Sequence, residues 1–173
     1  SGTRKSGTTR RGIGPSYSDK CLRIGIRVGD IFDENFLRER LSNALNNKNP
    51  QLEKIYNRPV FESGPILELL ARFRERVRDM VTNTPHYLNV AAEQKKKILL
   101  EGAQGDALDI DHGTYPFVTS SNTTIGGAMS GTGLNPFQIS EIVGITKAYI
   151  TRVGEGPFPT EDLGEGGKQL REK

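Results

Sequence analysis

The chain has 173 residues, of which 34% are hydrophobic and 26% charged, and its mean hydropathy is −0.53. This length suits one ordinary domain, but the apolar share is low for a domain that folds alone, so we expect part of a core to be missing. The single cysteine, Cys21, excludes an intrachain disulfide and a cysteine-rich metal site. It fits a reducing compartment, and no apolar run approaches the ~20 residues that span a bilayer. We therefore expect a cytoplasmic location and no membrane partner.

The net charge of +3 is unevenly distributed. Residues 1–28 carry seven basic side chains and one acidic side chain, a net +6, which leaves −3 for the remainder. A basic segment favours an anionic partner, and a solvated tail is the alternative for Arg4 and Lys5. Nucleic acid is disfavoured as this partner, because the chain lacks the interleaved aromatic and basic residues typical of single-strand binders.

The first third of the chain predicts a loop followed by a helix. Residues 1–19 are rich in Gly, Ser, Thr and Arg and are expected to form a loop. Residues 22–32 alternate apolar and polar side chains, which favours a short strand or an extended turn. Asp33 then fits the N-cap of a helix with one apolar face. We expect this helix to end between Asn46 and Pro50.

Helical spacing continues through the middle of the chain. Ser63 fits the cap of a second helix, with Pro65 in its first turn, and the apolar spacing persists to about Thr82. Residues 87–94 predict a short further helix. Residues 33–97 are therefore expected to form a mostly helical insertion.

Residues 98–161 have a different character and predict a strand–loop–helix–strand unit. The apolar run at 98–100 predicts a short buried strand, 134–143 a brief helix, and the β-branched and aromatic run at 147–153 another strand. The loop at 105–133 is long and polar, and such loops inside compact proteins are usually functional or disordered. Strands separated by helices favour an α/β layer with parallel pairing.

Three segments rich in hydroxyl groups and glycine carry the candidate chemistry. Residues 6–17 combine hydroxyls, accessible backbone N–H groups and arginines, which suits phosphate binding; a flexible basic linker is the alternative. Gln104 ends a predicted strand, so its amide is expected at the carboxyl edge of a sheet, where it can read a purine edge. The hydroxyls of 119–124 suit phosphate or ribose, but we expect most of them to bond turn backbone groups. In residues 150–161, a strand leading into a Val-Gly-x-Gly-Pro turn can present a backbone carbonyl to a sugar hydroxyl.

A run of acidic residues raises the question of a metal site. Asp106, Asp109, Asp111 and His112 offer ligands for Mg²⁺ or Zn²⁺. Residues of this kind more often cap turns and bond to their own loop, so the sequence favours capping over a metal. Neither a G-x-x-x-x-G-K-[ST] loop nor a G-x-S-x-G elbow occurs in the chain.

Four motifs in order, GTTRRGIGPSYSDK, IRVGDIF, EGAQGDALDIDHGTYPFVTSSNTT and KAYITRVGEGPFPTE, resemble the adenylosuccinate synthetase family. The resemblance covers nearly the whole chain and is weakest from about Asn46 to Lys97. It implies an α/β fold, P-loop-NTPase-like, with a large, mostly parallel sheet flanked by helices, of which residues 1–173 are an internal and incomplete part. It also implies a GTP-dependent ligase of AMP biosynthesis. Such an enzyme joins IMP and L-aspartate into adenylosuccinate, releases GDP and phosphate, requires Mg²⁺, and works as a cytoplasmic homodimer.

The resemblance also implies roles for five residues. Thr9 and Thr119 match threonines that bind the 5′-phosphate of IMP, and Gln104 matches the glutamine that contacts the hypoxanthine base. Val153 matches the position whose backbone meets the ribose. Arg23 matches the arginine that reaches across the dimer to the IMP phosphate of the neighbouring subunit.

The chain also departs from the family pattern. The family's GDEGKGK-type loop with the catalytic aspartate, its catalytic histidine, its arginine-rich aspartate loop and its K-x-D guanine motif do not occur in these residues. Arg10 stands where the family usually has Gly or Lys, and Asp106 where a hydroxyl or apolar residue is common. We therefore expect the isolated chain to carry half of the IMP site and to be inactive alone. A non-catalytic nucleotide-binding or dimerisation module is the alternative.

Overall fold

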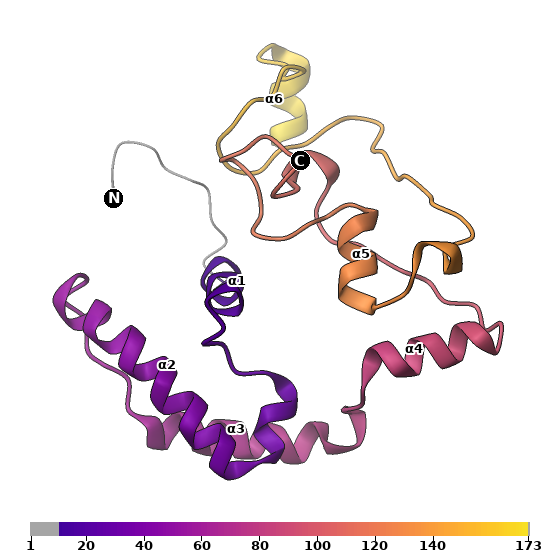
Figure 1. Cartoon of the computed structure of the whole chain (residues 1–173). Coiled ribbons are helices and arrows are strands. Elements are labelled where there is room, and N and C mark those ends of the chain that lie inside the picture. The colour runs from indigo at the N-terminus through magenta and orange to yellow at the C-terminus, as the bar shows by residue number, and fades with distance from the viewer. Residues whose placement is uncertain (1–10, 173) are drawn as a thin grey trace. The chain divides into compact units, whose positions relative to one another are not determined.

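The structure, a computed structural model, describes residues 11–172, which divide into two compact units (Figure 1). One unit is Gly12–Thr84, and the other contains the described residues from Pro85 onward. The helices in chain order are α1 (Ile13–Leu22), α2 (Glu34–Lys54), α3 (Ser63–Val77), α4 (Thr84–Glu93), α5 (Ile125–Thr132) and α6 (Glu165–Arg171). The 3₁₀ turns are η1 (Val28–Phe32), η2 (Arg78–Met80), η3 (Asp106–Leu108) and η4 (Pro136–Gln138).

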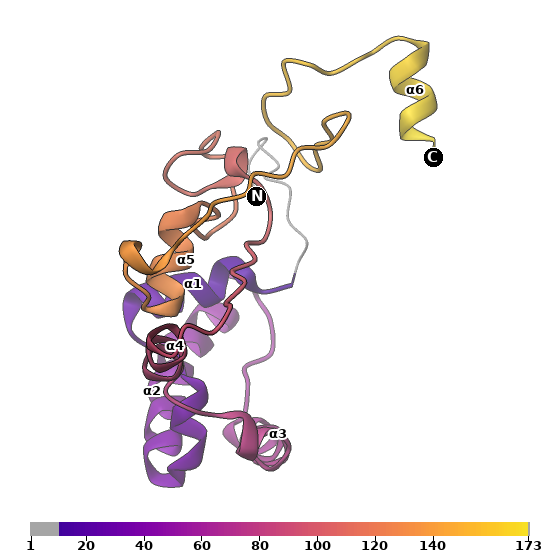
Figure 2. The ribbon, with the colours of Figure 1, turned by 90° about the vertical axis from the view of Figure 1, so that its right-hand side faces the viewer.

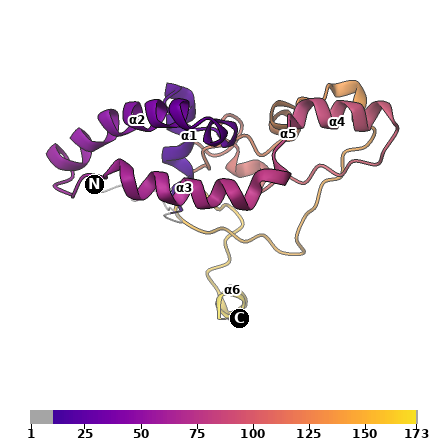
Figure 3. The same ribbon diagram turned by 90° about the horizontal axis from the view of Figure 1, so that it is seen from below.

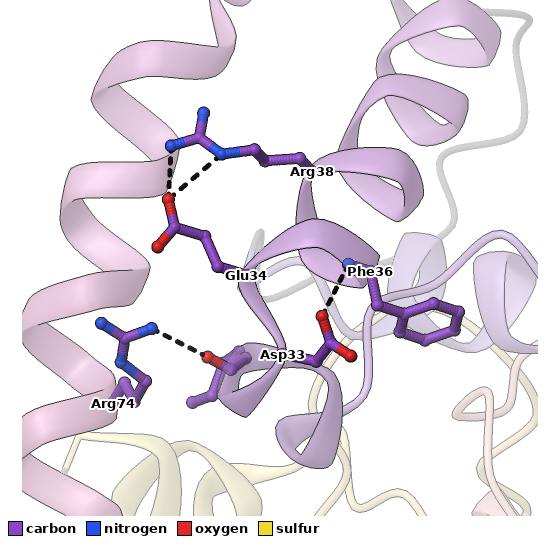
Figure 4. Close-up of polar contacts among 6 residues, drawn as sticks. Asp33, Glu34, Phe36, Arg38 and Arg74 are labelled. Atoms are coloured by element: carbon purple, nitrogen blue, oxygen red, sulfur yellow. Dashed lines mark hydrogen bonds and ion pairs between the residues drawn. The ribbon is translucent and has the colours of Figure 1, made fainter.

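Helix α2 begins where the sequence predicts (Figure 4). The Asp33 carboxylate accepts a hydrogen bond from the Phe36 backbone N–H at 3.0 Å, which satisfies one of the free donors of the first turn. One turn later, Glu34 and Arg38 pair across the helix surface at 2.6 Å. The predicted N-cap at Asp33 is therefore confirmed.

The core of the first unit lies between η1, α2 and α3. Ile31 of η1 and Leu37 and Leu41 of α2 are its buried apolar residues, each no more than 4% exposed. Figure 3 shows α2 and α3 side by side, and Arg74 of α3 donates to the Ile31 carbonyl at 3.5 Å. The spacing Leu37–Leu41 places both leucines on one face of α2, which explains why this face is the one covered.

The predicted end of the first helix is wrong. Helix α2 continues through Pro50 to Lys54. Pro50 removes one backbone donor near the helix end, but neighbouring polar groups hold the last turn. The Asn49 side chain exchanges two hydrogen bonds with the Phe61 backbone at 2.9 and 3.0 Å, and Gln51 donates to the Asn47 carbonyl at 2.9 Å.

Helix α3 starts one residue earlier than expected and is shorter. Ser63 is its first helical residue rather than its cap, and the preceding Glu62 makes no side-chain capping bond. The regular helix ends at Val77, after which η2 takes three residues into a tighter turn. The predicted short helix near 87–94 is confirmed as α4.

In the second unit, α4 packs against the end of α5 and against η4 (Figure 2). The Asn89 side chain of α4 donates to the Gly133 carbonyl at 3.1 Å and accepts from Gln138 at 3.1 Å. Leu134 and Ala91, 5% and 8% exposed, are the buried apolar residues here. Helix α5 lies inside the predicted loop, and the helix expected over 134–143 is reduced to η4.

Neither predicted strand forms within residues 11–172, because no segment there pairs into a strand. Residues 98–100 and 147–153 are neither helical nor strand-paired, and Leu99, expected to be buried, is 88% exposed. For residues 22–32 the sequence allowed a short strand or an extended turn, and the structure shows the extended turn, which leads into η1. A strand is defined by hydrogen bonds to a neighbouring strand, and residues 11–172 supply no such neighbour to either segment. Within the described residues, no helix is both long and apolar enough to cross a bilayer.

Candidate functional site

The loop between α4 and α5 is organised around the buried carboxylate of Asp109, which is 0% exposed. Its Oδ1 accepts from the backbone N–H groups of Asp111 and His112 at 2.9 and 3.1 Å. Its Oδ2 accepts from the N–H groups of Thr123 and Thr124 at 2.7 and 3.4 Å. One side chain therefore joins two arms of the loop that are fourteen residues apart in sequence.

Two competing effects act on the ionisation of Asp109. Burial disfavours the charged carboxylate, but the four backbone N–H groups together outweigh burial and hold the pKa of Asp109 well below its usual range. The carboxylate is therefore ionised at neutral pH, with its oxygens fully engaged by the loop.

The acidic run is bonded within its own loop. The Asp111 carboxylate accepts from the Asn122 amide at 2.6 Å, and that amide also donates to Asp109 at 3.3 Å. In the part of the chain that is described, no group of three or more His, Cys, Asp or Glu residues could hold a metal ion. The expectation that these residues cap turns and bond to their own loop backbone is confirmed for Asp109, whereas the Asp111 carboxylate bonds a side chain.

The same loop holds Gln104 and Thr119. Backbone bonds join the two arms, from the Thr119 N–H to the Leu108 carbonyl at 2.9 Å and from the Ile110 N–H to the Ser121 carbonyl at 3.2 Å. The turn at Gln104, where φ is +64°, is tied on by the Thr123 hydroxyl, which donates to the Gly105 carbonyl at 2.9 Å. The exposed Gln104 side chain and Thr119 thus belong to one hydrogen-bonded frame.

Most hydroxyls of the cluster are not used by the loop, contrary to expectation. Thr123 bonds a turn carbonyl, as predicted for the majority. The hydroxyls of Thr119, Ser120, Ser121 and Thr124 make no hydrogen bond with any described residue. Their backbone is held by Asp109 and the paired arms instead, so the hydroxyls stay available to a ligand.

The turn that carries Val153 is attached to this loop by Arg152. The Arg152 guanidinium donates to the Thr114 hydroxyl at 3.1 Å and to the Phe117 carbonyl at 2.9 Å. It also donates to the Glu155 carbonyl within its own turn, at 3.2 Å. Val153 itself is 95% exposed, so the structure brings its backbone to the loop through its neighbour rather than through packing.

Arg23 lies in the other unit, directly after α1. Its backbone adopts φ +62° at the helix end, and its N–H donates to the Lys20 carbonyl at 3.1 Å. The Arg23 guanidinium makes no hydrogen bond or ion pair with the described residues. It lines a cavity of ≈ 860 Å³ together with the basic residues Lys20, Arg27 and Arg40 and one acidic residue, Asp19, so the lining is net positive.

The structure therefore groups three of the five predicted site residues, Gln104, Thr119 and Val153, in one unit. Arg23 belongs to the other unit, and Thr9 lies outside the described residues. Turn capping by Asp109 was predicted, but its bonds to Thr123 and Thr124 across the loop and the role of Arg152 were not. The sequence carried a signal for Asp109, because Asp followed two residues later by a polar turn is typical of Asx turns. Arg152 had no comparable signal.

The loop backbone and the Val153 turn are thus held by polar side chains, the buried Asp109 and the partly buried Arg152. Comparison with known proteins identifies the class: the family Adenylosuccinate synthetase matches residues 1–173, and the chain belongs to this family.

Known members agree over almost the whole chain. The chain is 52% identical over 170 residues to adenylosuccinate synthetases from Bifidobacterium animalis subsp. lactis and Streptomyces griseus. Each match covers 98% of this chain and 40% of the relative. A solved structure of fully ligated adenylosuccinate synthetase from Plasmodium falciparum matches with a TM-score of 0.88 and 41% identity, over 98% of this chain and 39% of that one. The chain thus spans about two fifths of the length of these relatives.

Proposed function

We propose that this chain supplies part of the IMP site of an adenylosuccinate synthase. Such a GTP-dependent ligase forms adenylosuccinate from IMP and L-aspartate, with GDP and phosphate as the other products. The observation that carries the proposal is the loop braced by Asp109, which fixes the backbone around Thr119 while the Thr119 hydroxyl has no hydrogen-bond partner among the described residues.

The family resemblance gives each of the five site residues a role in this proposal. Thr119 donates its hydroxyl to the 5′-phosphate of IMP, and the exposed Gln104 amide, both donor and acceptor, reads the hypoxanthine edge. The Val153 backbone meets the ribose. Arg23 reaches the IMP phosphate of the neighbouring subunit in a cytoplasmic homodimer, and Thr9 adds a second hydroxyl to the phosphate.

GTP and Mg²⁺ are assigned to the longer enzyme rather than to this chain. GTP, when bound, would supply the phosphoryl group that activates the 6-oxygen of IMP for displacement by aspartate. The described residues do not fit the metal, because both oxygens of the Asp109 carboxylate are bonded by the loop and no cluster of three or more His, Cys, Asp or Glu side chains occurs among them. The part of the chain described here therefore binds and orients IMP, and the isolated chain is inactive.

The predicted parallel sheet is also part of the proposal. Residues 98–100 and 147–153 become strands when the remaining polypeptide supplies neighbouring strands. The high structural similarity to a family member that is about two and a half times longer supports this, since the backbone path already matches. The exposure of the apolar side chains in both segments is the expected consequence of leaving those neighbours out.

A thermal-shift titration of the 173-residue chain with IMP tests the half-site, with inosine as the phosphate-free control. Ligand at ten times its Kd raises the stability of the native state by about 1.4 kcal/mol. We expect a rise in Tm with IMP and a much smaller rise with inosine. Equal rises would contradict a site that reads phosphate.

An exchange chimera tests the reaction. The matching segment of the Streptomyces griseus relative is replaced by this chain, and adenylosuccinate formation is measured with IMP, aspartate and GTP. We expect activity within about tenfold of the parent, because the swapped segments are 52% identical. A folded chimera that binds IMP without forming product would favour the non-catalytic binding module instead.

A further inference from the structure

The guanidinium of Arg152 joins two segments that are far apart in sequence. Nη2 contacts the Thr114 hydroxyl and the Phe117 carbonyl, 38 and 35 residues earlier, and the Glu155 carbonyl of its own turn. Nε adds a second bond to that carbonyl at 3.3 Å. All three acceptors are uncharged, and Arg152 has no carboxylate partner among the described residues. Its donors lie in one plane, so they fix direction as well as distance.

Little else holds the Val153 turn in place. Residues 147–151 are exposed, and Val153 is 95% exposed, so apolar packing contributes almost nothing here. The polar bonds of Arg152 are therefore the main restraint on where the Val153 backbone lies. Thr119 follows Phe117 by two residues, so the same guanidinium restrains both the ribose-facing turn and the phosphate-facing segment.

The glycine at position 156 supports this close approach independently. Its φ is +122°, a backbone conformation that residues with a side chain rarely adopt. A Cβ at this position would collide with the Arg152 guanidinium and with the Phe117 ring. The turn can thus wrap around the guanidinium only because residue 156 has no side chain.

We infer that Arg152 is a positioning residue for IMP, which sets the spacing between the Val153 backbone and the Thr119 hydroxyl without touching the nucleotide. This inference rests on the proposed function, since it assumes that these two groups contact one ligand. A ligand bound through its ribose and its phosphate requires the two protein groups that contact it to be positioned to within about half an ångström.

The first test uses the 173-residue chain and does not depend on activity. Hydrogen exchange and NMR backbone order parameters are measured in the wild type, Arg152→Gln, Arg152→Lys and the control Arg76→Gln, an exposed change on α3. We expect Arg152→Gln to speed exchange at least about tenfold at the Phe117 and Thr119 amides, which are hydrogen-bonded in the loop. In residues 153–156 we expect the order parameters to fall from about 0.85 to below about 0.6, because the guanidinium no longer holds the turn. The control should change neither segment. A change in only one segment, or in neither, would overturn the inference.

The second test uses the exchange chimera and separates positioning from general destabilisation. For Arg152→Gln we expect the KM for IMP to rise at least about tenfold and the KM for GTP to stay nearly unchanged, whereas a general loss of stability would lower the Tm and affect both substrates. Arg152→Lys should recover little, since an ammonium cannot span the same acceptors in the same plane. A parallel rise in both KM values, or an unchanged KM for IMP, would reject the positioning role. A wild-type chimera without activity would reject the proposed function, while the exchange experiment would still decide whether Arg152 couples the two segments.

Discussion

Replacing Arg40 by methionine should release the turn that carries Arg23. The Arg40 guanidinium donates to the carbonyls of Arg23 and Gly25 at 3.1 and 2.5 Å, and lies 4.0 Å from the Asp30 carboxylate. Methionine keeps much of the stem's volume but removes every donor. The change therefore tests the polar bonds rather than the packing of α2.

The magnitude follows from two hydrogen bonds with a charged donor. Such bonds contribute about 1.5–3 kcal/mol each. The Arg40 side chain is 27% exposed, so water compensates part of the loss and the low end of the range applies. We expect a loss of about 2–3 kcal/mol in the free energy of unfolding, or about 10–20 °C in the Tm of a unit of this size.

The assay is circular dichroism melting of the 173-residue chain, with hydrogen exchange to localise the effect to residues 23–26. Arg38→Met is the matched control, since it makes the same change on the same helix, but its partner Glu34 is exposed and the pair contributes little. The control should lower the Tm by less than about 2 °C. Equal losses of Tm in the two variants, or unchanged hydrogen exchange at residues 23–26 in Arg40→Met, would refute the idea that Arg40 holds this turn.

Two further predictions concern the loop. The folded pKa of Asp109 lies below the unfolded value of about 3.9, so its contribution to stability is complete above that pH and decreases as the pH falls below it. In Asp109→Asn, acid titration followed by circular dichroism should lose this decrease and start from a lower Tm; an unchanged acid profile would contradict the role of the carboxylate. Thr119→Val should abolish most of the IMP-dependent rise in Tm but leave the Tm of the free chain unchanged, because its hydroxyl has no internal partner. Thr123→Val should lower the Tm of the free chain, because its hydroxyl holds the Gly105 carbonyl; the reverse pattern would show that the two hydroxyls were assigned wrongly.

Local signals in the sequence located elements that depend on local interactions. The Asp33 cap and the apolar spacing after it gave the start of α2, and similar spacing gave α3 and α4. The helix end predicted at Pro50 was wrong because a proline disfavours the helix only locally. The bonds between Asn49 and Phe61 that hold the last turn join residues twelve positions apart.

Other elements could not be read from composition. Helices α1 and α5 are built from segments rich in Gly, Ser and Thr, which have low helix propensity and suggest loops. The strand predictions at 98–100 and 147–153 are wrong for the described residues, because apolar and β-branched side chains indicate a strand only where a neighbouring strand is available for pairing. For the site, residue types identified Gln104 and Thr119 as candidates. The local capping by Asp109 could be predicted, but its bond to Thr123 and the bond of Arg152 to Thr114 could not, because they span fourteen and thirty-eight residues.

The exposed apolar run near the end of the chain has a consequence for how such a protein is made. Ile142, Val143, Ile145, Tyr149 and Ile150 are each more than half exposed. An uncovered stretch rich in β-branched residues is a template for intermolecular pairing. During synthesis this stretch emerges with its apolar side chains uncovered, so association with other chains competes with folding until a neighbouring segment covers it. Co-expression with the flanking parts of a relative should therefore give a larger fraction of non-aggregated protein than refolding the chain alone from denaturant.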